Sequence, residues 1–159
     1  MTVNNVGIYA SQISGHLWAP NGAMDALAST TLSTTATSVT FAGIPQGYKH
    51  LQIRSIARDN AGAGTVTYMK VNFNGDSGSN YSYHRVFGDG SSATADAGSS
   101  ITQTYANFAL ANSSTTQIMG ASIVDILDYN NTSKYKTIRT LAGADQMAQV
   151  ALVYLLVYG

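Results

Sequence analysis

The acidic residues of this 159-residue chain are all aspartates, because the sequence contains no glutamate. Glutamate is a strong helix former, whereas Asp, Asn, Ser and Gly favour turns and helix caps. The chain is rich in Ser, Thr, Asn and Gly, and Thr, Val, Ile, Tyr and Phe dominate its apolar and semi-polar positions. The latter residues suit a pleated surface. The sequence therefore predicts an all-β domain with many turns and little surface helix.

The charge and cysteine content exclude several classes of function. Charged residues make up 10% of the chain, and they balance to a formal net charge of +0. A nucleic-acid-binding protein needs a basic patch that displaces counterions, so we expect no nucleic-acid partner. Without cysteine there is no disulfide and no thiolate metal site. A near-neutral surface resists association poorly, which favours a subunit of a larger assembly over a monomer.

The hydrophobic segments are too short to cross a membrane as helices. No run approaches 18 apolar residues, so we expect no membrane partner. Residues 1–5 lack the positive charge and the long apolar run of a signal peptide. The apolar run from Val150 to Tyr158 has the length of a strand, and the whole chain fits one domain with a real core.

Residues 1–23 differ from the rest of the sequence and are expected to form an N-terminal arm. Apolar residues alternate irregularly with Asn, Ser, Gly and Gln, and Asp, Glu, Lys and Arg are absent. One interpretation is an arm that docks onto a neighbouring subunit; the other is a first strand packed on its own domain. The candidate interface residues are Val6, Ile8, Tyr9, Ile13, Leu17 and Trp18.

Short alternating segments separated by turn clusters fill residues 24–159. We expect strands over residues 25–32, 38–41, 50–58, 65–73, 81–87, 113–129 and 147–158, with a further strand over 135–141 and a strand or irregular segment over 101–110. We expect turns or loops over residues 43–48, 59–64, 91–100, 129–133 and 142–146. This spacing indicates an antiparallel β-sandwich of jelly-roll type.

No constellation of catalytic residues stands out. The three histidines, His16, His50 and His84, accompany no Gly-x-Ser-x-Gly nucleophile motif. Asp125 and Asp128 are three residues apart, so on a strand they would face opposite sides and would not form the carboxylate pair of a glycosidase. We therefore expect no enzyme, no catalytic residue and no cofactor.

Two binding hypotheses stay open at the level of sequence. The segment Asn72–Asn80 gathers oxygen ligands that calcium could use. Its spacing fails the EF-hand pattern, and Asx-rich turns need no ion because Asn and Asp bond their own backbone. We expect no metal there. Exposed tyrosines near Tyr81 and Tyr83 could stack on a sugar, although Tyr is also a routine strand residue.

Several phrases of the sequence carry a family resemblance. They are LASTTL at 27–32, SVTF at 38–41, IPQGYKHLQIR at 44–54, VNFNGD at 71–76, SNYSYH at 79–84, and IVDILDY at 123–129 with Asn131, Lys134, Lys136, Thr137 and Arg139 after it. Together they are similar to a β-sandwich module of tailed-bacteriophage virion proteins. The resemblance covers about residues 24–158.

The resemblance implies a structural role in a phage particle. Such modules occur in minor structural, tail-fibre and capsid-decoration proteins, and the module brings no catalytic residues with it. We expect a capsid decoration, or cement, protein on the outer surface of the virion shell, a homo-oligomer and most simply a trimer, bound to the major capsid protein. A tail or baseplate adaptor and a receptor- or glycan-binding tail protein are the alternatives.

Overall fold

The computed structural model describes residues 24–60, 66–88, 90–110, 119–146, 149–150 and 153–158. Within these ranges the regular secondary structure consists of strands and turns, without a helix. The all-β class is therefore confirmed. No described segment forms a helix that is long and apolar enough to cross a membrane.

The chain divides into two compact units, Met1–Ile44 and Pro45–Gly159. The described part of the first unit, residues 24–44, forms no strand, so the strands predicted over 25–32 and 38–41 are wrong. A strand is held by a ladder partner, and no described strand pairs with this segment. Its Ser and Thr hydroxyls compete for backbone groups in non-ladder conformations. The predicted arm, residues 1–23, lies outside the described residues.

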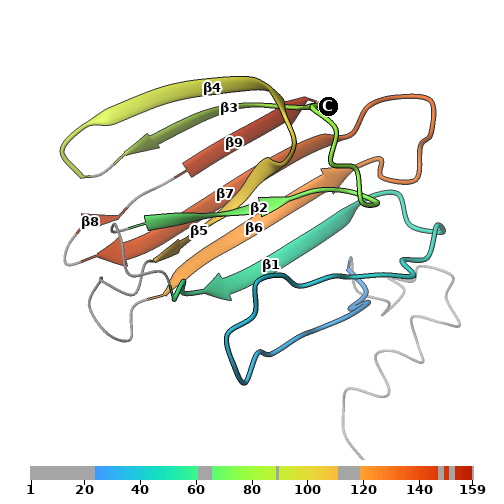
Figure 1. The fold of residues 1–159 in the computed structure, drawn as a ribbon, viewed down its shortest axis with the longest axis horizontal. Coiled ribbons are helices and arrows are strands. Elements are labelled where there is room, and N and C mark those ends of the chain that lie inside the picture. The colour runs from blue at the N-terminus through green and yellow to red at the C-terminus, as the bar shows by residue number, and fades with distance from the viewer. Residues whose placement is uncertain are drawn as a thin grey trace, which may run out of the picture. The chain divides into compact units, whose positions relative to one another are not determined.

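The described residues of the second unit form nine strands (Figure 1). They are β1 Leu51–Ala57, β2 Val66–Val71, β3 Tyr81–Gly88, β4 Ala93–Ile101, β5 Thr104–Leu110, β6 Gly120–Leu127, β7 Thr137–Gln146, β8 Gln149–Val150 and β9 Val153–Tyr158. The strands predicted over 50–58, 65–73 and 81–87 are thereby confirmed, and the segment 101–110, expected to be a strand or irregular, contains β5. The strand predicted over 113–129 contains β6 but ends before the turn at Asp128 and Tyr129, and the described residues of 147–158 form the two strands β8 and β9.

The strands form one large antiparallel sheet and one two-stranded ribbon. The large sheet has the order β1-β6-β7-β9-β3-β4, with β8 paired to β7, and the ribbon pairs β2 with β5. Strand β5 packs against β6 and β7, so the ribbon lies on one face of the large sheet (Figure 1). We call that face the inner face and the opposite one the outer face.

The core lies between β5 and the inner face of the large sheet. Strand β6 alternates between buried and more exposed positions along its whole length, which is the period-2 pattern of a strand with one covered face. Val124, Ile126 and Ile138 are buried together with Ala106 of β5. The partly buried residues packed around them are Leu51, Ile53, Val71, Phe73, Tyr83, Tyr105 and Tyr129.

Two predicted turns are strands in the structure. Residues 91–100, expected to be a loop because of their Ser, Gly and Ala content, lie mostly within β4, which pairs along β3. Small residues are needed there because a Cβ at Gly98 would stand 2.5 Å from the ring of Tyr83. Residues 142–146, expected to be a turn, continue β7, which still pairs with β6 at Ala144.

The two longest phrases of the family resemblance meet in space. Strand β1 pairs with β6 along its whole length. At one end of this pair, Tyr129 donates its hydroxyl hydrogen to the carbonyl of Pro45, and the Asn130 side chain donates to the carbonyl of Gln46. The backbone N–H of Asp128 donates to Nδ1 of His50 at 3.0 Å. These two phrases therefore contribute to a structural connection between two loops.

Candidate functional site

The outer face aligns exposed apolar side chains in rows. The register places Ile123 of β6 between Arg54 of β1 and Leu141 of β7. The same row continues through position 154 of β9 to Val86 of β3. Side chains that share a row across neighbouring strands are in contact distance, so Arg54, Ile123 and Leu141 form a continuous strip.

The apolar residues of the outer face are exposed to solvent. Ile56 is 73% exposed and Val86 is 55% exposed, and the others are also in the exposed class. The members of this exposed set are Ile56, Val86, Ile123, Leu127 and Leu141. Single exposed apolar residues are common on monomers, whereas large contiguous apolar patches are typical of interaction sites.

A polar network adjoins the apolar row on the outer face. Arg54 donates from Nε to Oε1 of Gln52 at 2.7 Å, and Gln52 donates from Nε2 to Oδ1 of Asp125 at 2.8 Å. Arg139 completes the network by donating from Nη2 to Oδ2 of Asp125 at 2.8 Å. The network joins β1, β6 and β7 and holds a defined charge pattern beside the apolar strip.

The contribution of this network to the stability of the fold depends on pH through the Asp125 carboxylate. The hydrogen bond from Gln52, followed by the hydrogen bond and charge of Arg139, holds the pKa of Asp125 below its usual value of 3.8. Because the folded pKa is the lower one, Asp125 stabilises the fold above pH 3.8, and this contribution disappears as the pH falls through the folded pKa.

We expect the Asp125→Asn variant to lose about 0.5 kcal/mol of unfolding free energy at pH 7, the size typical of partly exposed ion pairs, and less at pH 2.5, because the contribution falls as the pH drops below 3.8. Urea denaturation at the two pH values measures this difference. A variant with the same deficit at both pH values would show that the Asp125 charge is not what stabilises the network.

The inner face holds a second charged group, enclosed by aromatic rings. The Arg85 guanidinium lies 4.5 Å from the ring centroid of Tyr68, 4.9 Å from that of Phe87 and 5.1 Å from that of Tyr105. Cations over aromatic faces are attracted by the ring quadrupole, more strongly where water is excluded. Arg85 is thus held between β3 and the β2–β5 ribbon.

Asp96 of β4 neutralises this guanidinium. It accepts two hydrogen bonds from Arg85, from Nε and Nη2, each at 2.5 Å. The Arg85 side chain is only 10% exposed, and its Nη1 is buried without a hydrogen-bond partner among the described residues. The hydrogen bond to Asp96 raises the pKa of Arg85, against desolvation, so the group is charged at every pH of interest. Burial, then the charge of Asp96, raises the pKa of the neighbouring Tyr83.

The residues singled out from the sequence do not converge on one site. The candidate interface residues Val6, Ile8, Tyr9, Ile13, Leu17 and Trp18 all lie outside the described residues, as does His16. Asp125 faces outward from β6, whereas Asp128 follows the strand with a φ of 48° and pairs with Lys134. His84 is exposed on the outer face of β3, and His50 precedes β1.

In the segment Asn72–Asn80, which was considered as a calcium site, hydrogen-bond donors of the segment itself bind the Asp76 carboxylate. The carboxylate of Asp76 accepts hydrogen bonds from the backbone N–H of Gly78 at 2.9 Å and from the Asn80 side chain at 3.0 Å. The Tyr81 hydroxyl donates to the Asp76 carbonyl at 3.2 Å. Both carboxylate oxygens face hydrogen-bond donors here, which is the arrangement of an Asx-type turn. Among the described residues, no group of three or more His, Asp or Glu side chains could hold a metal ion.

Known proteins offer no further guide to the site. In comparisons with them, no family model, no curated protein and no solved structure matched this chain.

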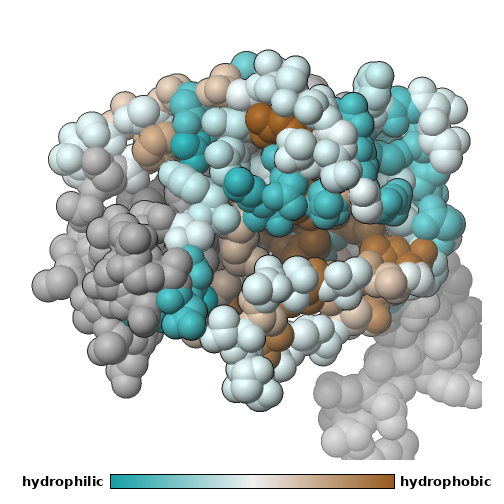
Figure 2. All heavy atoms as spheres, viewed as in Figure 1, coloured by the Kyte–Doolittle hydropathy of each residue, from teal (hydrophilic) through white to brown (hydrophobic). Residues whose placement is uncertain are grey.

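The surface composition agrees with the low charge of the sequence. Figure 2 shows one face of the molecule, on which weakly polar, pale residues predominate and strongly hydrophilic residues gather in patches.

Sequence reasoning missed the two features that the structure brings together. The outward positions of β1 were visible in the alternation of Gln52, Arg54 and Ile56, but their alignment with Asp125 and Leu141 depends on strands 60 or more residues away. The Arg85–Asp96 pair was missed because Asp96 was assigned to a loop. Treating the segment around Asp96 as a strand would have made Asp96 a candidate partner for a neighbouring strand, but only the register in the structure places it opposite Arg85.

Proposed function

We propose that this chain is a structural protein that works by adhesion, of the tailed-phage virion class that its sequence resembles, and that it decorates the capsid. The observation that carries the proposal is the exposed apolar set of the outer face, Ile56, Val86, Ile123, Leu127 and Leu141. A structural protein needs such a surface, whereas a catalyst needs converging titratable groups.

The outer face is large enough to supply most of the area of one side of an interface with another subunit. Six neighbouring strands spaced about 4.8 Å apart, with roughly seven residues each at about 3.3 Å per residue, span roughly 600 Å². A specific interface buries about 800 Å² on each partner. We assign the remainder to the predicted arm, with Trp18 and Tyr9 as aromatic anchors of the kind that dominate interfaces. The jelly-roll form of the sandwich and the trimeric state belong to this proposal as well.

The expected assembly depends on the outer face. We expect the wild-type chain to be a homo-oligomer and to co-sediment with phage shells that lack it. The Ile123→Lys variant should be monomeric and should lose shell binding by at least tenfold, because a charge then has to be desolvated in the middle of the apolar strip. Light scattering after size exclusion measures the oligomeric state, and co-sedimentation measures the binding.

A matched control separates the outer face from general surface effects. Tyr135 is 85% exposed and lies in the loop before β7. The Tyr135→Lys variant, like Ile123→Lys, replaces an exposed large side chain with one positive charge. We expect this variant to assemble and bind like wild type. An Ile123→Lys variant that still assembles would refute the proposed use of the outer face, and electron-microscopic density confined to the tail would refute capsid decoration.

A further inference from the structure

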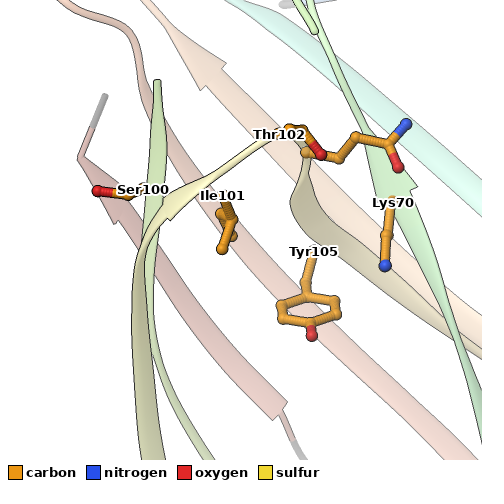
Figure 3. Close-up of a pocket in the computed structure, with 6 residues that line it drawn as sticks. Lys70, Ser100, Ile101, Thr102 and Tyr105 are labelled. Atoms are coloured by element: carbon orange, nitrogen blue, oxygen red, sulfur yellow. The ribbon is translucent and has the colours of Figure 1, made fainter. Parts of the chain in front are cut away.

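A hollow of about 320 Å³ opens where β4 turns into β5, beside β2. It is lined by Lys70, Ser100, Ile101, Thr102, Gln103 and Tyr105. Figure 3 shows the side chains of Lys70, Ile101 and Tyr105 projecting into the same space, with Thr102 at the turn above them. One aromatic ring, one cation, one amide and the Thr102 hydroxyl thus line a common volume, which lies within the size range of small-molecule sites, whereas the Ser100 side chain points away from it (Figure 3).

Both register shifts in the described strand ladders lie at this hollow. In the ribbon, Lys70 pairs with Tyr105 while Met69 pairs with Asn107, so β5 carries one extra residue next to Tyr105. In the large sheet, Tyr81 pairs with Ile101 while Tyr83 pairs with Gly98, so two residues of β4 stand opposite one of β3. Bulges re-aim side chains and are enriched next to binding sites.

The backbone at the rim of the hollow is strained. Ser100 has a φ of 55°, in the left-handed region. The other described non-glycine residues with positive φ are Asn74 and Asp128, and these two residue types tolerate that region. Serine has no such allowance, so Ser100 holds a sparsely populated backbone conformation beside the bulge between β3 and β4. Strain of this kind gathers at ligand sites.

The ring at the floor of the hollow is held in place. The ring of Tyr105 makes edge contacts with Tyr83 at 4.7 Å and with Tyr68 at 5.1 Å between centroids. Lys70 places Nζ 5.9 Å from the Tyr105 centroid and pairs with no carboxylate among the described residues. The hollow therefore offers a fixed aromatic surface beside an uncompensated positive charge.

We propose that this hollow binds an acidic saccharide unit. The apolar C–H groups of a sugar ring would lie on Tyr105, its carboxylate would accept a charge-assisted hydrogen bond from Lys70, and its hydroxyls would bond Gln103 and Thr102. This site is separate from the adhesive surface of the outer face and goes beyond the proposed structural function. A shell protein with such a site would attach the particle to polysaccharide that carries uronic acids.

The test is a titration of the full-length protein followed by amide chemical shifts. The probes are a glucuronate-containing disaccharide, maltose as its neutral counterpart, and inorganic phosphate as a simple anion. We expect shifts of the amides of residues 100–105 with the acidic disaccharide, and an affinity about tenfold higher than for maltose, the effect of one charge-assisted hydrogen bond. Lys70→Met should remove this preference, and Gln103→Ala should weaken both sugars.

A control variant and two outcomes make the test decisive. Lys49→Met removes one exposed positive charge from the loop before β1 and should leave the titration unchanged. Tyr105 is left intact because its ring supports Tyr68 and Tyr83. Absence of shifts at residues 100–105, or equal affinity of wild type and Lys70→Met for the acidic disaccharide, would overturn the proposal. Equal shifts with phosphate alone would reduce the site to one for small anions and would overturn the saccharide assignment.

Discussion

Replacing Ile138 by alanine is expected to lower the free energy of unfolding by about 2–5 kcal/mol, the range measured when a buried Ile, Leu or Met is replaced by Ala. Ile138 is 0% exposed and packs with Val124, Ile126 and Ala106 where β5 crosses the large sheet. The change removes buried apolar surface and leaves a cavity that the rigid β-sheet neighbours cannot close. Urea denaturation followed by fluorescence or circular dichroism measures the loss.

Ile56→Ala is the matched control for this variant. It is the same substitution in a strand, so the difference in β-propensity cancels, but Ile56 is 73% exposed. At a concentration where the chain is monomeric, we expect its effect to stay within about 0.5 kcal/mol. At higher concentration a larger effect of Ile56→Ala would mean that the outer face is buried in an assembly, as the proposed function requires. A small effect of Ile138→Ala would contradict the placement of the core.

Removing the carboxylate of Asp96 is the second variant with a large expected effect. The Arg85 side chain is 10% exposed and is enclosed by the rings of Tyr68, Phe87 and Tyr105. Asp96→Ala removes the negative charge that neutralises it. Breaking a buried ion pair from one side costs about 3–5 kcal/mol. Because Asp96 itself is 35% exposed, water can reach part of the site, and we expect a loss of about 3 kcal/mol. Urea denaturation at pH 7 is the measurement.

A double variant distinguishes the charge from the packing. In Arg85→Met with Asp96→Ala no charge remains buried, so this protein should be more stable than Asp96→Ala alone. If the double variant is less stable than the single one, the contacts between Arg85 and the rings, not the ion pair, hold the ribbon to the sheet. Asp125→Ala, which removes the partner of the 60% exposed Arg139, is the exposed counterpart and should cost about 0.5 kcal/mol.

The ion pair, the ring cluster and the hollow form one connected region. Tyr105 belongs both to the rings around Arg85 and to the lining of the hollow. Asp96 is connected to the hollow through Arg85, which contacts the Tyr105 ring. The proposed sugar site and the apolar outer face lie on different parts of the second unit, so each can be altered without the other.

The sequence by itself determined the class of the fold and much of its local structure. The absence of glutamate and the alternation around Ile53 and Tyr83 predicted strands correctly, because strand periodicity and turn preference are properties of neighbouring residues. The same local logic correctly placed turns near Gln46 and Asn130. It failed where small residues form a strand only because a partner strand is present, as around Gly98 in β4.

Only the tertiary structure decided which residues from distant segments of the chain lie next to one another. The outer row joins Arg54, Ile123 and Leu141 through ladder pairings between segments that are far apart in the chain. The hollow depends on two bulges, and the enclosure of Arg85 depends on a ribbon packed against a sheet. The physical reason is that alternation fixes which residues share a face of one strand, whereas the choice and register of the partner strand come from the packing of the whole domain.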